Sequence, residues 1–405
     1  MSLVNIRTTT AFINNPDVGK MDSFIGGVKK IEEEIKIRTK RVSLKIEDFS
    51  DKSINKISKD VENLGYWGFS VSFNDPTDEE QIKNAKKILS NTKNGFVNFK
   101  ITKKGRELDS NLILPSTDLI IDTSKVENGF NNFRLGFSFG LENETPFFPY
   151  SAVGDKEGFS VGLEYIEAML EIISQNNRES LNNIRNKLIT QLGNNFANIA
   201  KMCESIEEES GLEFLGIDLS IAPYPYPLED QSVIDLIEAL GNIGRSRGDT
   251  EFHAGMNGTI FLHTYITSII KEIIKVSDFK VTGFNGVMYS VLEDSKLSKR
   301  YANGDIRVSD LLLTSTTCGC GIDMVPITGW GIHKSVSSLF FDIYALSNAL
   351  NKPLALRILP IPNSRPGDLT EFRHLFFANT RLSEDRSGIS INELPAQKKD
   401  PVINM

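Results

Sequence analysis

The stretch that decides the fold is VNIRTTTAF at Val4–Phe12, together with the segments that follow at residues 23–35 and 36–44. Val4–Phe12 alternates apolar and polar residues with a period of two, which predicts a β-strand, and the turn residues NNPD follow at 14–17. Residues 23–35 have the spacing of an amphipathic helix, and residues 36–44 repeat the strand pattern. A strand, a helix and a second strand in this order predict a parallel βαβ unit.

The same alternation continues along most of the chain. Further strands are predicted at 68–73, 95–101, 131–139, 212–221, 279–282, 286–290 and 354–360. Helices are predicted at 48–64, 77–89, 159–175, 180–209, 232–240, 259–275 and 333–350. We therefore expect an α/β fold of eight to ten βα units, closed or nearly closed into a barrel with its helices outside. No linker divides the chain, so we expect one domain over 1–394 and a polar tail over 395–405.

Composition and charge narrow the class of partners. The chain has 405 residues, of which 40% are hydrophobic and 24% charged, as in ordinary globular proteins. Its formal net charge is -8, so no global attraction to nucleic acid or to an anionic membrane is expected. The basic run at 36–45 is interpreted as a strand with one solvated face. The expected partner is a small-molecule ligand, with a second copy of the chain in a homo-oligomer.

Cysteine usage and hydropathy indicate a compartment. The three cysteines are an odd number, no apolar secretory segment stands at the N-terminus, and no apolar run is long enough to span a membrane. These features favour a reducing environment, and the cytoplasm is the expected location.

The stretch CGCGIDMVP at Cys318–Pro326 is the first candidate site. Two thiols, two glycines and a carboxylate within six positions predict a site loop rather than a core strand, because glycine adopts positive φ and lets a ligand approach the backbone. Cys318 is the candidate nucleophile, since backbone N–H groups near it would lower the pKa of its thiol, and Gly319 and Gly321 are candidate ligand-binding residues. The alternative is that Cys318 is a small buried hydrophobic residue. We expect Gly321 to have a positive φ or to bring its backbone into contact with a ligand.

Four carboxylates follow or end predicted strands, where a parallel barrel places its functional groups. Asp323 and Glu293 are assigned as catalytic acid/base groups, with His253 as a third catalytic candidate, and Asp218 as a ligand-binding residue. Glu293 and Asp294 are candidate ligands of a divalent cation, the only cofactor that these residues suggest. The alternative is that some of these carboxylates only cap helices or turns.

Further groups are suited to an anion. Gly255, Gly258 and Thr259 precede a long predicted helix, whose N-terminal N–H groups could bind a negative charge. Arg357 lies in the last predicted strand and could hold a carboxylate or phosphate. A tight turn is the alternative explanation for the glycines.

Several motifs carry a resemblance to a known family. They are GIDLSIAP at 216–223, Gly255 with Gly258 and Thr259, TGFNGVM at 282–288 with LED at 292–294, CGCGIDMVP at 318–326, NFR at 132–134, TPFFP at 145–149 and GFSVGLE at 158–164. In that combination the chain resembles the domain of unknown function 711 family, over a region from the first strand to about Arg381. The resemblance implies a ten-stranded α/β barrel similar to the pyruvate formate-lyase-like fold, and it implies no reaction.

Two departures from known patterns bear on mechanism. Glycyl radical enzymes on that barrel carry a C-terminal R-V-x-G-[YF] motif, whereas Arg386–Ile389 reads RSGI, so radical chemistry is disfavoured. The family usually continues its proline with a Gly-Asp pair, but here Gly329 is followed by Trp330.

Together these observations predict an enzyme that acts on a small anionic metabolite through a thiol and carboxylate site. Cys318 would be the nucleophile or acid, Asp323 and Glu293 the acid/base groups, and glycine N–H groups would stabilise negative charge. Two alternatives stay open. One is a ligand-sensing or regulatory barrel without turnover, and the other is a hydrolase that depends on a divalent metal.

Overall fold

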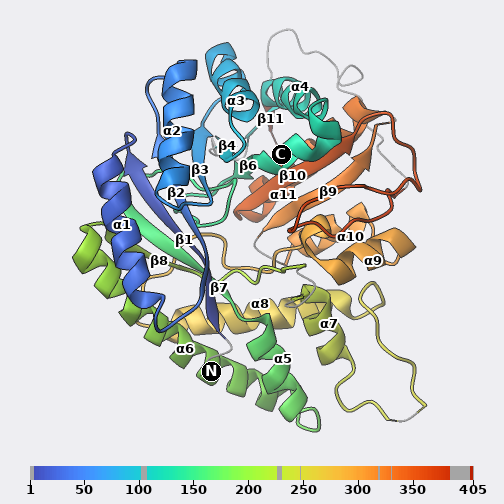
Figure 1. The fold of residues 1–405 in the computed structure, drawn as a ribbon. Coiled ribbons are helices and arrows are strands. Elements are labelled where there is room, and N and C mark those ends of the chain that lie inside the picture. The colour runs from blue at the N-terminus through green and yellow to red at the C-terminus, as the bar shows by residue number, and fades with distance from the viewer. Residues whose placement is uncertain are drawn as a thin grey trace.

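The computed structural model describes residues 4–101, 107–225, 230–246, 248–317, 320–329, 331–383 and 402–404. Within these residues nine strands form one sheet, in the order β8-β7-β1-β2-β3-β4-β6-β10-β9 (Figure 1). Their bounds are β1 (Asn5–Asn14), β2 (Ile37–Lys45), β3 (Gly68–Phe73), β4 (Gly95–Ile101), β6 (Leu135–Phe139), β7 (Gly158–Glu164), β8 (Glu213–Asp218), β9 (Gly321–Thr328) and β10 (Leu354–Ile361). Two short strands, β5 (Glu107–Asp109) and β11 (Val402–Asn404), pair separately.

The sheet consists of two parallel sets that run in opposite directions. Strands β1, β2, β3, β4 and β6 are parallel neighbours. Strand β7 is parallel to β8 and β10 is parallel to β9, while the β1–β7 and β6–β10 contacts are antiparallel. One end of the sheet therefore combines the starts of the first set with the ends of the second.

The sheet is not closed by a continuous ladder. Between the edge strands β8 and β9, residues 281–290 form isolated parallel bridges, from Val281 to Ile217, from Val287 to Ile221 and from Ser290 to Asp323. The expected α/β class is confirmed, whereas the ten strands are found only as nine strands and these bridges. The predicted strands at 279–282 and 286–290 are not regular strands.

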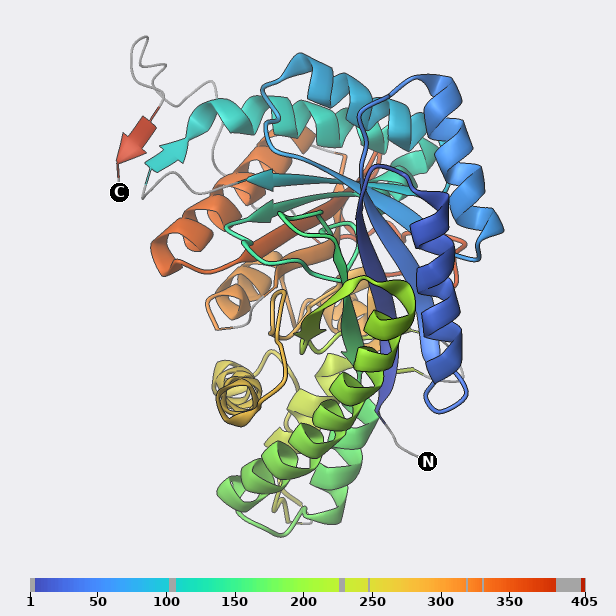
Figure 2. The same ribbon diagram turned by 90° about the vertical axis from the view of Figure 1, so that its left-hand side faces the viewer.

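The helices flank the sheet (Figures 1 and 2). They are α1 (Val18–Ile31), α2 (Asp51–Asn63), α3 (Glu79–Asn91), α4 (Ile113–Ser124), α5 (Ile166–Gln175), α6 (Leu181–Ser210), α7 (Val233–Gly241), α8 (Thr259–Val276), α9 (Ser295–Asn303), α10 (Val308–Ser315) and α11 (Ile332–Leu350). Their amphipathic spacing accounts for this position: α2, for example, buries Ile54, Ile57 and Val61 on one face. No helix among the described residues is long and apolar enough to cross a membrane.

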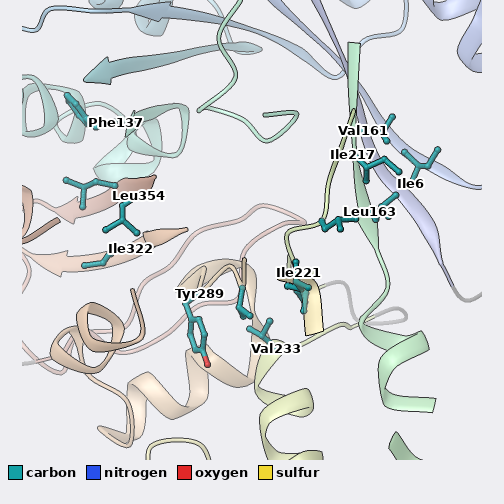
Figure 3. Close-up of a cluster of buried hydrophobic side chains, with 14 of the residues drawn as sticks. Ile6, Phe137, Val161, Leu163, Ile217, Ile221, Val233, Tyr289, Ile322 and Leu354 are labelled. Carbon is teal, nitrogen blue, oxygen red and sulfur yellow. The ribbon is translucent and has the colours of Figure 1, made fainter. Parts of the chain in front are cut away.

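Apolar side chains from both strand sets form the core (Figure 3). Figure 3 shows Ile6, Val161 and Ile217 from neighbouring strands β1, β7 and β8, and the other half contributes Phe137 and Leu354. Each is at most 1% exposed, and burying such a side chain contributes roughly 1.5–3 kcal/mol.

The middle of the connection between β6 and β7 is packed inside the molecule. Residues 145–151, which include the TPFFP motif, are all buried. Polar side chains of the strands satisfy its carbonyl groups: Thr10 Oγ1 donates to the carbonyl of Pro146 at 2.8 Å, and Ser70 Oγ donates to that of Ser151 at 2.8 Å. A buried loop needs such partners, because an unpaired buried carbonyl is costly. The small polar residues of the strands thus make room for this loop and bind it.

The prediction of a site loop at 318–326 is wrong for the described part, because Gly321–Thr328 is the fully buried strand β9. Two features let this unusual sequence lie in a sheet. The carboxylate of Asp323 is neutralised by Arg357 of the adjacent strand β10. Gly321 has φ of 81°, as expected, and a Cβ atom there would lie 2.2 Å from the carbonyl oxygen of Ala355.

The helix predicted at 159–175 is also wrong, since the strand β7 comes first and only residues from Ile166 onward are helical. Small residues explain the difference. A Cβ atom on Gly162 would lie 2.6 Å from the ring of Phe147, so this face of the strand contacts the interior loop. The prediction at 131–139 was too long, because Glu127–Arg134 is a 3-10 segment.

Candidate anion-binding site

A cavity of about 30 Å³ opens where β1, β2 and β3 begin. Its described lining consists of Arg7, Arg38, Thr39, Arg41, Trp67, Phe133, Tyr224, Pro225, Glu293 and Phe376. The antiparallel arrangement of the two strand sets explains this composition. The arginines stand near the starts of β1 and β2, while Tyr224 and Glu293 follow β8 and the bridged residue Ser290.

Two of the arginines have no partner among the residues that the structure describes. Neither the side chain of Arg7 nor that of Arg41 forms an ion pair or a hydrogen bond there, and Arg7 Nη1 and Arg41 Nε are buried without an acceptor. Burial lowers the pKa of Arg7, and burial together with the charge of Arg7 lowers the pKa of Arg41 to about 9. Buried charged donors without acceptors are costly, and an anion in the cavity would supply the acceptors.

Aromatic rings hold the two unpaired guanidinium groups. Arg41 Cζ lies 4.5 Å from the ring centroid of Trp67 and 5.1 Å from that of Phe148. Arg7 Cζ lies 5.7 Å from the ring centroid of Tyr224. Such cation–π contacts stabilise the charge through the ring face. The ring of Tyr224 also contacts Arg38, whose Cζ lies 3.7 Å from its centroid.

The other two arginines beside the cavity are paired. Arg38 donates to Glu164 from Nε at 2.7 Å and from Nη2 at 2.5 Å. Arg357 donates to both carboxylate oxygens of Asp323 at 2.7 Å, and its Nη2 donates to Glu293 Oε2 at 3.1 Å. Bidentate pairs of this kind have strong and well-defined geometry.

The structure thus brings together Asp323, Glu293 and Arg357, three of the residues selected from the sequence. Asp323 does not line the cavity, and it accepts a further hydrogen bond from Tyr150 Oη at 2.6 Å. Burial and the charge of Asp323 raise the pKa of Tyr150 well above its usual value. Glu293 lines the cavity and accepts from Ser290 Oγ at 2.8 Å. Asp323 therefore holds Arg357, and Glu293 is the carboxylate that a ligand would meet.

Asp218 lies in a separate buried network. It accepts from Thr145 Oγ1 at 2.8 Å, from Ser220 Oγ at 2.6 Å and from the backbone N–H groups of Phe284 and Asn285. Burial raises the pKa of Asp218. These bonds hold the segment after Val281 against β8, and Asp218 does not line the cavity.

Asp294 caps α9. It accepts from Ser232 Oγ and from the backbone N–H groups of Val233, Lys296 and Leu297, and burial raises its pKa to about 6. Across the described ranges, no group of three or more His, Cys, Asp or Glu side chains has an arrangement that could hold a metal ion. The assignment of Asp294 and Glu293 to a cation stays a prediction.

The residues selected near the start of α8 lie elsewhere. His253 Nδ1 accepts from Arg300 Nη2 at 2.7 Å, and the backbone N–H of Gly255 donates to Thr259 Oγ1 at 3.0 Å. Gly258 precedes α8 with φ of 104°. None of these four residues lines the cavity, so the structure does not bring them to Glu293.

Several selected positions lie outside the described residues, namely Cys318, Gly319, Trp330 and the segment Arg386–Ile389. The neighbouring Cys320 is buried, with its Sγ 3.9 Å from Ser220 Oγ.

Sequence reasoning missed Arg7, Arg38, Arg41 and Trp67. The basic residues at 36–45 were interpreted as a solvated face, whereas Arg38 and Arg41 line the cavity. A signal was present, because arginines near the starts of two consecutive parallel strands must lie at the same end of the sheet.

Comparison with known proteins places the chain in a family. A model of the family described as "Uncharacterised ACR (DUF711)" matches residues 35–374. Similar proteins include a UPF0210 protein of Pyrobaculum aerophilum, 25% identical over 70% of this chain and 60% of its own length, and one of Pyrobaculum arsenaticum, 27% identical over 60% and 52%. A UPF0210 protein of Methanocaldococcus jannaschii is 24% identical over 86% of this chain and 73% of its own length.

The match spans less than two thirds of the length of the two Pyrobaculum relatives. The family model, in contrast, covers far more than half of this chain. The chain therefore belongs to the uncharacterised DUF711 family.

Proposed function

We propose that the protein is an enzyme that binds a small anionic metabolite in the arginine-lined cavity and uses Glu293 as its general acid or base. The observation that carries this proposal is the pair of guanidinium groups, on Arg7 and Arg41, that border a cavity without a carboxylate partner among the described residues. A fold rarely buries two unpaired charges for stability alone, because each costs free energy until an anion binds.

The chemistry follows from the neighbours. Arg7 and Arg41 would hold the anionic group and stabilise negative charge that develops next to it. Glu293 would accept or donate a proton at an adjacent atom, and its hydrogen bonds from Arg357 and Ser290 would keep its carboxylate in one orientation. Asp323 and Tyr150 would act on the position of Arg357.

The barrel expected from the sequence fits the same proposal. The bridges made by residues 281–290 support a role for this segment as a tenth, irregular strand between β8 and β9. Glu293 follows this segment, so the segment would position Glu293 at the cavity from between the edge strands β8 and β9.

The binding step can be tested by calorimetry with a panel of small carboxylates and phosphates. We expect at least one anion to bind, and Arg7→Met and Arg41→Met each to weaken it about tenfold or more, since tenfold is about 1.4 kcal/mol. Arg178→Met, at an exposed arginine away from the cavity, is the matched control. Equal affinity in all four proteins would contradict the proposal.

Turnover needs its own measurement. After incubation with the protein, the bound anion should be converted, as seen by mass spectrometry, and Glu293→Gln should slow the conversion more than it weakens binding. Arginine-dependent binding without conversion would instead favour a ligand-sensing protein.

A further inference from the structure

The charges around the cavity limit the ligand. Arg7 and Arg41 line the cavity without an ion-pair partner among the described residues, and Glu293 lines it as well. One negative charge on a ligand would pair with the two arginines. A second negative charge would be placed near the carboxylate of Glu293, which would repel it.

The size of the cavity limits the ligand as well. A single water needs roughly 10–15 Å³ of such space, so the cavity, at about 30 Å³, has room for a group of a few atoms. The largest of the surface grooves among the described residues has a different lining. The groove of about 630 Å³ beside α5 and α7 is lined by Glu167 and Glu171 without any arginine or lysine.

The shape of the donors favours a planar acceptor. The rings of Trp67 and Tyr224 contact Arg41 and Arg7, and Arg41 Nε and Arg7 Nη1 have no acceptor among the described residues, so these N–H groups remain for a ligand. A guanidinium edge presents two parallel N–H groups that match the two oxygens of a carboxylate.

From charge, size and shape together, we propose that the ligand is a small monocarboxylic acid whose single carboxylate binds Arg7 and Arg41, and that Glu293 excludes doubly charged anions. This inference rests on the proposed anion site and specifies its substrate class. Phosphate and dicarboxylates share the negative charge, and the experiment separates them.

The test compares the dissociation constants of propionate, lactate, propionamide, malonate and inorganic phosphate for the full chain, at a pH where phosphate is mostly doubly charged. We expect propionate or lactate to bind at least tenfold more tightly than malonate and phosphate, and propionamide not to bind. Glu293→Gln should reduce the preference against malonate and phosphate by about tenfold, because it removes the repelling charge. Glu33→Gln, at an exposed surface position, should leave the preference unchanged.

The outcomes separate the two proposals. If phosphate or malonate binds as tightly as the monocarboxylates, and Arg7→Met and Arg41→Met abolish that binding, the substrate class is wrong and the anion site stands. An unchanged preference in Glu293→Gln would likewise overturn the role of Glu293 in selectivity. If no anion binds, or if binding is indifferent to both arginine substitutions, the anion site and the substrate class are both wrong.

Discussion

Two sets of buried arginines lie close together and differ in their partners. Arg357 is paired with carboxylates, whereas Arg7 and Arg41 form no ion pair among the described residues. Arg357 has a complete set of partners, and although burial alone would lower its pKa, the charges of Asp323 and Glu293 raise it above the usual value. Arg41 has aromatic neighbours and no ion pair with a carboxylate among the described residues, and its pKa is lowered to about 9. Burial by itself therefore does not identify a ligand site. Arg357 is paired within the fold, whereas the described residues offer Arg7 and Arg41 no ion-pair partner, and this difference is the basis of the proposed anion site.

The largest effect on stability is expected for the paired arginine, Arg357. Asp323→Asn leaves Arg357 buried without its bidentate partner and should destabilise the protein by about 3–5 kcal/mol in urea unfolding. Asp118→Asn, at an exposed carboxylate, is the control. A loss of less than 1 kcal/mol for Asp323→Asn would show that the pair is not what stabilises this part of the sheet.

Substitution of the unpaired Arg41 should affect the affinity for the anion and not reduce stability. Arg41→Met removes a buried charge that has no ion-pair partner within the described residues, so the free energy of unfolding should stay unchanged or rise by about 1 kcal/mol, while the affinity for the anion falls about tenfold. Arg357→Met, measured in the same urea series, should clearly destabilise the protein. The contrast between the two sets of arginines would be lost if both substitutions had the same effect on stability.

The pH dependence of anion binding tests the role of Arg41 separately from that of Arg357. The pKa of Arg41 in the folded state, about 9, lies below that of an arginine in the unfolded chain. Between the two values the unfolded state binds more protons, so the contribution of Arg41 to the free energy of unfolding rises with pH there. Below about pH 9 Arg41 is charged in both states. Anion affinity should therefore be constant up to that pH and then fall, by up to about tenfold per pH unit. Calorimetry across this range on the wild type checks it, and a flat profile in Arg41→Met would assign the step to Arg41.

The smallest effect is expected for Tyr150→Phe. It removes one hydrogen bond to Asp323 and leaves the lining of the cavity intact, so stability should fall by about 1 kcal/mol with less than a threefold change in anion affinity. Urea unfolding and calorimetry on one preparation give both numbers. A large loss of affinity would mean that the two sets of arginines are coupled through Arg357.

Local patterns predicted much of the fold. The strands at 68–73 and 95–101 were predicted with their observed bounds, and α6 within one residue at each end, because an alternating or helical pattern decides the conformation of a segment that packs on one simple surface. The prediction failed at 159–175 and at Gly321–Thr328. There, small residues and a carboxylate lie in strands because other parts of the chain, Phe147 and Arg357, occupy the space and balance the charge.

The amino-acid sequence was enough to predict the α/β class, the family and the choice of Asp323, Glu293 and Arg357 as candidates, since these depend on short-range patterns and on residue chemistry. Which of these groups are already paired follows from the three-dimensional arrangement of the chain. Arg7 and Arg357 are separated by almost the whole chain, yet both lie near Glu293, and nothing in their local sequence distinguishes them. The distinction comes from long-range contacts: a charge is structural or available according to which carboxylates and rings the fold brings within a few ångströms of it.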